Sequence, residues 1–135
     1  AKSVKEAYRF SVEGSELPFR ISFDQTLRLI LDDLTKKIPP SLISAKFHNT
    51  LARVIVSVAE KARLKEGIDT VVLVGGVFLN KVLLERATFL LEKDGFKVLR
   101  SLNYSPNDES ISIGQIAYAL NKLNAEARDG HSKTS

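Results

Sequence analysis

Residues 69–80 have the sequence Asp-Thr-Val-Val-Leu-Val-Gly-Gly-Val-Phe-Leu-Asn. Their β-branched and aliphatic run predicts a strand buried on both faces, and Gly75-Gly76 ends it. Apolar residues then recur at helical spacing up to Gly95, a residue that favours the end of a helix. These residues are Leu83, Leu84, Ala87, Leu90 and Leu91. Because residues 96–99 start a second strand, the pattern predicts a strand–turn–helix–strand unit with a right-handed parallel crossover.

The glycine pair allows two interpretations. In the first, Gly75-Gly76 is a tight strand-to-helix turn that requires a positive φ and lets helix and sheet pack closely. In the second, it is a phosphate or nucleotide loop, because a backbone without Cβ atoms lets a ligand approach and N–H groups at a helix start attract anions. The spacing matches neither a complete G-x-G-x-x-G motif nor a Walker loop. Asn80 favours the second interpretation, since its amide lies on the expected first helical turn and could bond a ribose or base.

Composition limits the possible classes of function. The chain has 135 residues, an apolar fraction of 44% and a net charge of +4, which predict one soluble, globular α/β domain. Without Cys, disulfides, thiol nucleophiles and cysteine metal sites are excluded. The positive charges are spread along the chain, which argues against a nucleic-acid surface. No apolar run or export signal indicates a membrane, so we expect a cytoplasmic protein. The chain also lacks Met, which suggests a piece of a longer protein or a processed product.

The residues before the central unit predict a β-hairpin and two helices. Alternating apolar and polar residues indicate a strand at residues 8–13, and residues 18–21 indicate its return. Asp24 is the expected N-cap of a helix with its apolar positions at Leu27, Ile30, Leu31 and Leu34. Ser41 is the expected start of the longest helix, which Gly67 closes.

Few side chains outside the glycine turn suggest chemistry. His48 lies on the long helix, where a lone histidine is either a structural residue bonded to a backbone carbonyl or a catalyst, and no nucleophile–base arrangement can be identified. Asp32 and Asp33 are interpreted as solvated. Asp108 follows the second strand and opens a helix, so it is either an N-cap or a carboxylate for a hard metal or a substrate.

The end of the chain completes the expected domain. Loops at the carboxyl ends of parallel strands line one crevice, so Asp108 should face the same crevice as Gly75-Gly76. The last helix is expected to carry Ile113, Ile116, Ala117, Leu120 and Leu123 on one face. We therefore expect a single domain at residues 1–123 and a disordered tail at residues 124–135.

Several of these segments together resemble the C-terminal end of the hydrogenase maturation carbamoyltransferase HypF. The resemblance rests on residues 69–80, 83–86, 106–108 and 111–115, and on the similarity of Phe47-His48-Asn49, with Leu51-Ala52 following, to an upstream helix of that family. It covers nearly the whole chain up to the tail. The Gly-Gly-Val-Phe-x-Asn and Pro-Asn-Asp pieces carry most of its specificity. They are shared more loosely with the TsaD proteins of tRNA threonylcarbamoylation.

The resemblance implies an α/β fold: the second lobe of an actin-like ATPase, ribonuclease-H-like, with an N-terminal β-hairpin followed by helices around a short mixed or parallel sheet. It implies that the complete protein uses carbamoyl phosphate and ATP to form carbamoyl-adenylate. The carbamoyl group then passes to the C-terminal cysteine of HypE, on the route to the cyanide ligands of nickel-iron hydrogenase. By position, Gly75, Gly76 and Asn80 would contact ATP or carbamoyl-adenylate. Asp108 would complete a divalent metal site shared with histidines of the first lobe.

The resemblance also implies that this lobe is not an enzyme by itself, because catalysis needs groups from both walls of a cleft. The expected partners are the remaining HypF lobe and domains and a HypE-type acceptor protein, and exposed apolar surface favours self-association. The family has Asp-Gly-Gly where this chain has Asp108-Glu109-Ser110, and the added charge opposes nucleotide binding. The alternatives are a non-catalytic interaction module with a degenerate nucleotide site and a TsaD-like lobe for tRNA modification.

Overall fold

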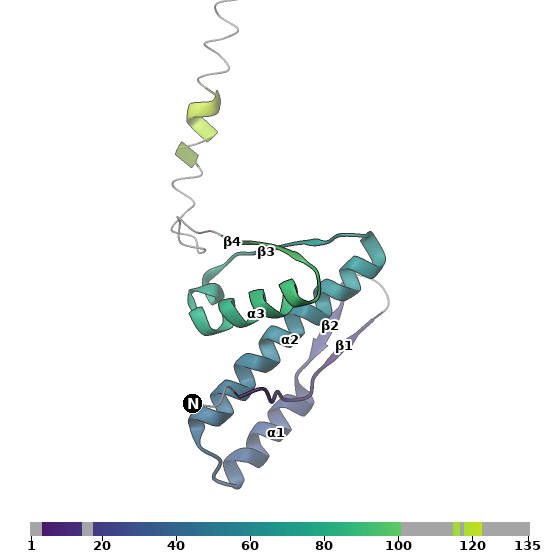
Figure 1. Ribbon diagram of the computed structural model, residues 1–135. Coiled ribbons are helices and arrows are strands. Elements are labelled where there is room, and N and C mark those ends of the chain that lie inside the picture. The colour runs from purple at the N-terminus through teal and green to yellow at the C-terminus, as the bar shows by residue number, and fades with distance from the viewer. Residues whose placement is uncertain (1–3, 15–17, 101–114, 117, 123–135) are drawn as a thin grey trace, which may run out of the picture.

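The computed structural model describes residues 4–14, 18–100, 115–116 and 118–122. The chain begins with an antiparallel hairpin of β1 (Ser11–Glu13) and β2 (Arg20–Ser22), followed by the helices α1 (Asp24–Thr35) and α2 (Pro40–Glu66). It continues through β3 (Thr70–Leu73), the 3-10 turn η1 (Gly76–Leu79), α3 (Lys81–Lys93) and β4 (Lys97–Arg100). Figure 1 shows α3 between the long α2 and the β3–β4 pair, with the hairpin and α1 along the rest of α2.

The predicted strand–turn–helix–strand unit is confirmed. β3 and β4 are parallel neighbours, with Thr70 paired to Lys97 and Leu73 paired to Arg100. α3 connects them, and Gly95 turns the chain into β4 with φ +82°. The α/β architecture of an N-terminal hairpin followed by helices around a small parallel sheet is therefore as expected. In the described part of the chain, no helix is long and apolar enough to span a membrane.

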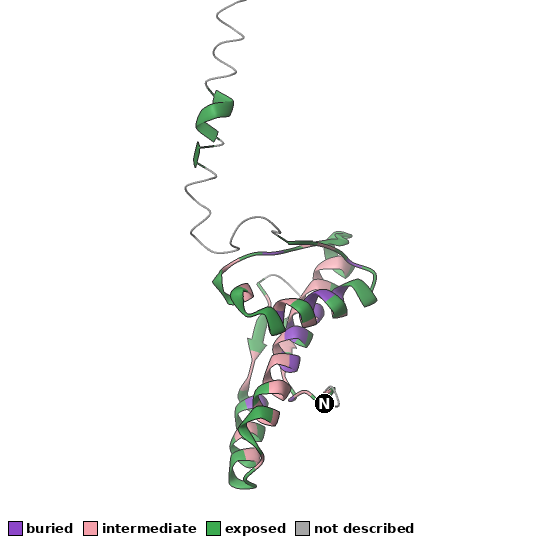
Figure 2. Cartoon of the chain, turned by 60° about the vertical axis from the view of Figure 1, so that its left-hand side comes forward, coloured by how far each residue is buried: buried purple, intermediate pink, exposed green. Residues whose placement is uncertain are grey.

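The core lies where α2, α3 and the β3–β4 pair meet. Its buried side chains are Ala52, Val56, Leu73, Leu83, Ala87, Leu91 and Phe96. On α3 the buried residues recur every four positions, as expected for a helix with one face in the core. Figure 2 shows these buried positions in purple where α2 and α3 approach each other. Burial of one large aliphatic or aromatic side chain contributes about 1.5–3 kcal/mol, so each large member of this cluster stabilises the fold by about that amount.

The prediction that the central strand is buried on both faces is wrong. Leu73 is only 3% exposed, but Val72 is 57% exposed. Val74 and Leu99 lie on the same open face, because side chains alternate along a strand and Leu99 is the partner of Val72. The described residues supply helices to one face of the sheet only. This face, defined by Val72, Val74 and Leu99, is called the open sheet face below.

Three of the four apolar positions predicted for α1 are exposed. Leu27, Leu31 and Leu34 are all more than half exposed, and they form the α1 stripe. Ile30, the fourth, is half-buried. The single buried residue of α1 is Thr26, whose hydroxyl donates a 2.6 Å hydrogen bond to the carbonyl of Arg9. This polar contact joins α1 to the segment that precedes β1, and the leucines of the α1 stripe face solvent.

The helix ends agree closely with the sequence patterns. α1 starts at Asp24, with Phe23 rather than Asp24 at the N-cap position. α2 starts at Pro40, one residue before Ser41, because proline suits the first helical position. Gly67 closes α2 in the left-handed conformation with φ +67°, as predicted.

The interpretation of Asp33 as a solvated residue is wrong. Its carboxylate accepts hydrogen bonds from the hydroxyl of Tyr8, at 2.8 Å, and from the ammonium of Lys46. These two donors, Lys46 first, lower the pKa of Asp33. Burial, together with the bond to Asp33, raises the pKa of Tyr8 to about 12. This cluster joins residues 4–10, called the N-terminal segment below, to α1 and α2. In addition, the backbone N–H of Tyr8 donates to the hydroxyl of Thr50 at 2.8 Å.

Candidate functional site

The glycine turn follows the carboxyl end of β3. Gly75 has φ +104° and ψ 159°, a conformation that is essentially restricted to glycine, whereas Gly76 starts η1 without a positive φ. The predicted positive φ is thus confirmed at the first glycine. Among the described residues, a Cβ atom placed on Gly75 would meet nothing within 4 Å. Close packing of α3 on the sheet is therefore not the reason for this glycine, and in the described part of the chain the space beside it is open.

Asn80 is the N-cap of α3 and does not lie on its first turn. Its Oδ1 accepts a 3.2 Å hydrogen bond from the backbone N–H of Leu83, which is the usual way in which an asparagine satisfies a helix start. Its Nδ2 lies 2.8 Å from Nε2 of His48 on α2. The residue is exposed, so its side chain joins two helices at the surface beside the glycine turn.

His48 is held from both sides of its ring. Nδ1 lies 2.8 Å from the carbonyl oxygen of Ser44, one turn earlier on α2, and Nε2 faces Asn80. The predicted bond of His48 to a backbone carbonyl is confirmed, although the residue is only half-buried. The contact with Asn80 joins residues 32 positions apart, and no pattern in the sequence indicates it.

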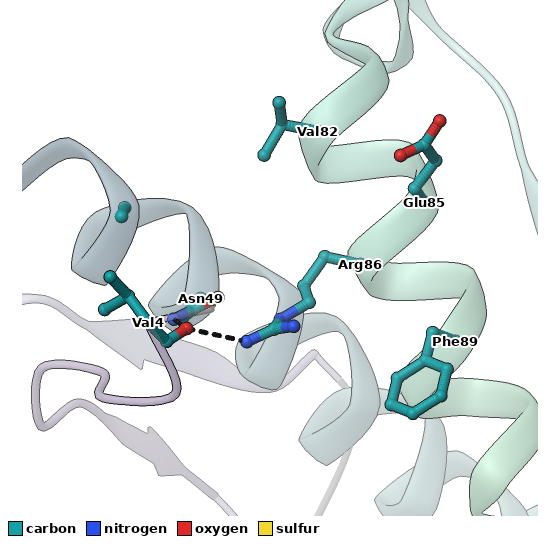
Figure 3. A pocket seen from close by; sticks show the side chains of 7 residues that line it. Val4, Asn49, Val82, Glu85, Arg86 and Phe89 are labelled. Carbon is teal, nitrogen blue, oxygen red and sulfur yellow. Dashed lines mark hydrogen bonds between the residues drawn. The ribbon is translucent and has the colours of Figure 1, made fainter. Parts of the chain in front are cut away.

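A hollow of about 340 Å³ lies beside this contact, between the first half of α2, the N-terminal segment and α3. Its lining residues are Val4, Ala45, Asn49, Val82, Glu85, Arg86 and Phe89. Figure 3 shows Arg86 reaching from α3 across the hollow, where its guanidinium donates a 2.9 Å hydrogen bond to the carbonyl of Val4. Asn49 donates to the carbonyls of Val4 and Glu6 at 2.8 Å each.

The hollow combines apolar walls with charged groups. Val82 and Phe89 are 61% and 60% exposed, and Glu85 and Arg86 stand between them on α3. Such a lining suits a group with apolar faces and a polar edge. Nothing in the sequence indicates the hollow, because its walls come from three separate segments.

Asp108 lies outside the described residues, as do its neighbours Glu109 and Ser110, so its metal role stays a prediction. In the described ranges, no group of three or more His, Asp or Glu side chains could hold a metal ion. The nucleotide-binding prediction concerns residues that the structure does describe. Gly75, Gly76 and Asn80 lie together at one end of the β3–β4 pair, with open space beside Gly75 and one amide hydrogen of Asn80 unused.

Comparison with known proteins gives the class of protein. The family model described as "Carbamoyltransferase, Kae1-like Domain, second subdomain" matches residues 1–115. The chain is 31% identical over 112 residues to carbamoyltransferase HypF of Synechocystis, a match that covers 83% of this chain and 14% of that protein. It is 32% identical over 106 residues to carbamoyltransferase HypF2 of Cupriavidus necator, covering 77% of this chain and 13% of that protein. These matches define a subdomain of a carbamoyltransferase.

A solved structure agrees with this class. The fold matches a crystal structure of full-length HypF in the phosphate- and nucleotide-bound form, with a TM-score of 0.78 and 37% sequence identity. That match covers 89% of this chain and 16% of the other. The chain belongs to the HypF family of carbamoyltransferases, as the second subdomain of its Kae1-like domain. The resemblance and the fold class predicted from the motifs are confirmed, and the chain spans only about one seventh of the length of its relatives.

Proposed function

We propose that this chain supplies one wall of the nucleotide site in a HypF-type carbamoyltransferase. The observation that carries the proposal is the turn after β3, where Gly75 has a conformation open to glycine alone and faces open space, beside the exposed amide of Asn80. A relative with 37% identity is known in a phosphate- and nucleotide-bound form. In this proposal ATP or carbamoyl-adenylate lies against Gly75, Gly76 and Asn80.

The proposed reaction of the complete protein follows the family. Carbamoyl phosphate and ATP form carbamoyl-adenylate, and the carbamoyl group passes to the C-terminal cysteine of a HypE-type acceptor for the cyanide ligands of nickel-iron hydrogenase. This chain would hold the adenine nucleotide, and Asp108 would contribute one ligand to a divalent metal ion. The remaining groups would come from the first lobe, so we expect no activity from the chain alone.

Two exposed apolar surfaces support the proposal that this chain binds other parts of the complete protein. The open sheet face and the α1 stripe both present aliphatic side chains to solvent. Exposed apolar patches of this kind commonly mark the surface where a protein binds a partner. We expect the isolated chain to bind the missing lobe or to self-associate. Sedimentation analysis at increasing concentration checks this, and a monomer without affinity for the first lobe would contradict it.

Calorimetric titration with ATP tests the proposed site. The titration uses the complete protein, or this chain with the first lobe supplied, and compares the wild type with Asn80→Ala. Loss of one hydrogen bond to the ligand should weaken binding about fivefold to tenfold. Glu60→Gln, at an exposed position of α2, is the control. ATP affinity that is the same in all three proteins, or absent from all, would contradict the proposal.

The interaction module is the second candidate, and the pair Glu109-Ser110 favours it. A carboxylate near the phosphates of a nucleotide opposes binding through like-charge repulsion. If the site is functional but weakened, Glu109→Gly with Ser110→Gly should strengthen ATP binding about tenfold after screening by salt. If the site has degenerated, neither version should bind ATP.

A further inference from the structure

We propose that His48 is a positioning residue that fixes the amide orientation of Asn80, so that the second Nδ2 hydrogen of Asn80 is presented to the bound nucleotide. The inference rests on the proposed nucleotide role of Asn80. It concerns a side chain on a different helix, and it adds a requirement on the ligand.

The ring contacts determine which nitrogen of His48 carries the proton. A carbonyl oxygen only accepts, so Nδ1, at 2.8 Å from the carbonyl oxygen of Ser44, must be the protonated nitrogen. In the neutral imidazole the other nitrogen, Nε2, is then an acceptor. The amide nitrogen of Asn80 only donates, and it lies 2.8 Å from Nε2. The neutral Nδ1–H tautomer is thus the single form of His48 that satisfies both neighbours.

The carbonyl oxygen of the Asn80 side chain confirms the same amide orientation. The backbone N–H of Leu83 donates and needs an acceptor, so the atom at 3.2 Å from it must be Oδ1. With Oδ1 at the helix start and one Nδ2 hydrogen on His48, the second Nδ2 hydrogen remains for a ligand. The ligand atom that meets this N–H group must be an acceptor, such as an unprotonated purine nitrogen or a ribose oxygen.

Protonation of His48 would oppose this arrangement. An imidazolium places an N–H group against the N–H group of Asn80, and the contact is restored only if the amide turns over. The turned amide would present Nδ2 to the N–H of Leu83 and so lose the cap. The described residues show no ion pair of His48. The charged residues close in sequence to the two contacting residues are Lys81 and Glu85 on α3 and Lys46 on α2, which is paired with Asp33.

Nuclear magnetic resonance of the chain without nucleotide tests the orientation. Nitrogen shifts of the neutral His48 ring should show a protonated Nδ1 and an unprotonated Nε2, the tautomer that both ring contacts require. Correlations should join Nε2 to the side-chain amide of Asn80. Detection of the Nε2–H tautomer would overturn the proposal.

Titration with ATP tests the effect on binding. It uses the complete protein and three variants. His48→Gln retains an acceptor at the position of Nε2, so its affinity should exceed that of His48→Leu about fivefold, the effect of one hydrogen bond. Ser44→Ala removes the hydroxyl that lies 3.5 Å from Nδ1 but retains the carbonyl that fixes the tautomer, so it should bind ATP like the wild type.

The outcomes separate this proposal from the one on which it rests. If His48→Leu binds ATP as tightly as the wild type, the positioning role is refuted while the nucleotide site stands. If the wild type binds no ATP under any condition, the nucleotide site is refuted, and with it the binding part of this inference. The ring tautomer then still decides whether His48 orients Asn80.

Discussion

The adjacent residues Gly75 and Gly76 provide a matched pair of substitutions with different expected effects. Gly75→Ala forces an L residue into φ +104° and ψ 159°, and a conformation of this kind costs about 1–3 kcal/mol. The new methyl group would contact nothing within 4 Å, so neither a clash nor a packing gain changes that figure. For a folded unit of roughly 100 residues, the melting temperature should fall by about 5–20 °C.

Gly76→Ala is the control for stability. Gly76 has no positive φ, and Gly→Ala at a compatible position commonly stabilises a protein by about 0.4–1 kcal/mol, because the unfolded chain loses freedom. If the turn is a ligand loop, this variant should instead weaken ATP binding, since the methyl group would stand where the nucleotide approaches. Differential scanning calorimetry of both variants, with ATP titration of Gly76→Ala, measures the two effects. A melting temperature of Gly75→Ala equal to that of the wild type would refute the assigned turn conformation.

Three further results are expected. Asn80→Ala should lower the free energy of unfolding by about 1 kcal/mol through loss of the helix cap, and Asn80→Asp, which retains an acceptor, should lower it less; chemical denaturation measures both. Leu91→Ala, at a position that is 0% exposed, should cost about 2–5 kcal/mol, whereas Phe89→Ala, at a position that is 60% exposed, should stay within about 0.5 kcal/mol. The pKa of Tyr8 is raised from 10.0 to about 12. Its contribution to stability is therefore complete below pH 10.0 and is lost as the pH rises towards 12, and denaturation at a series of pH values should show a smaller decline for Tyr8→Phe.

The parts of the fold that were predictable are those with local causes. The parallel unit of β3, α3 and β4 followed from an aliphatic run, a glycine pair and apolar residues at helical spacing. Gly67 and Gly75 have the positive φ values that turns require. These features depend on neighbouring residues only, so the amino-acid order suffices to indicate them.

The predictions that are wrong concern which side chains other elements bury or pair with. The run at residues 70–74 is typical of a strand with both faces buried, but Val72 is exposed because helices cover one face only. The sequence indicates a solvated Asp33 because its two hydrogen-bond donors, the hydroxyl of Tyr8 and the ammonium of Lys46, come from other elements. The contact between His48 and Asn80 was missed for the same reason. Burial and pairing across long separations depend on packing, which no local pattern encodes.

The position of the core determines how much free energy each part of the chain needs to unfold locally. All members of the buried cluster come from residues 52–96, whereas the N-terminal segment is joined to α2 and α3 by hydrogen bonds to the carbonyls of Val4, Lys5 and Glu6. Cooperative units of a protein exchange their amide hydrogens with different opening free energies. The amides of α3, β3 and the second half of α2 should therefore exchange only through global unfolding. Those of the hairpin and α1 should exchange through smaller openings, with a gradient of protection along α2.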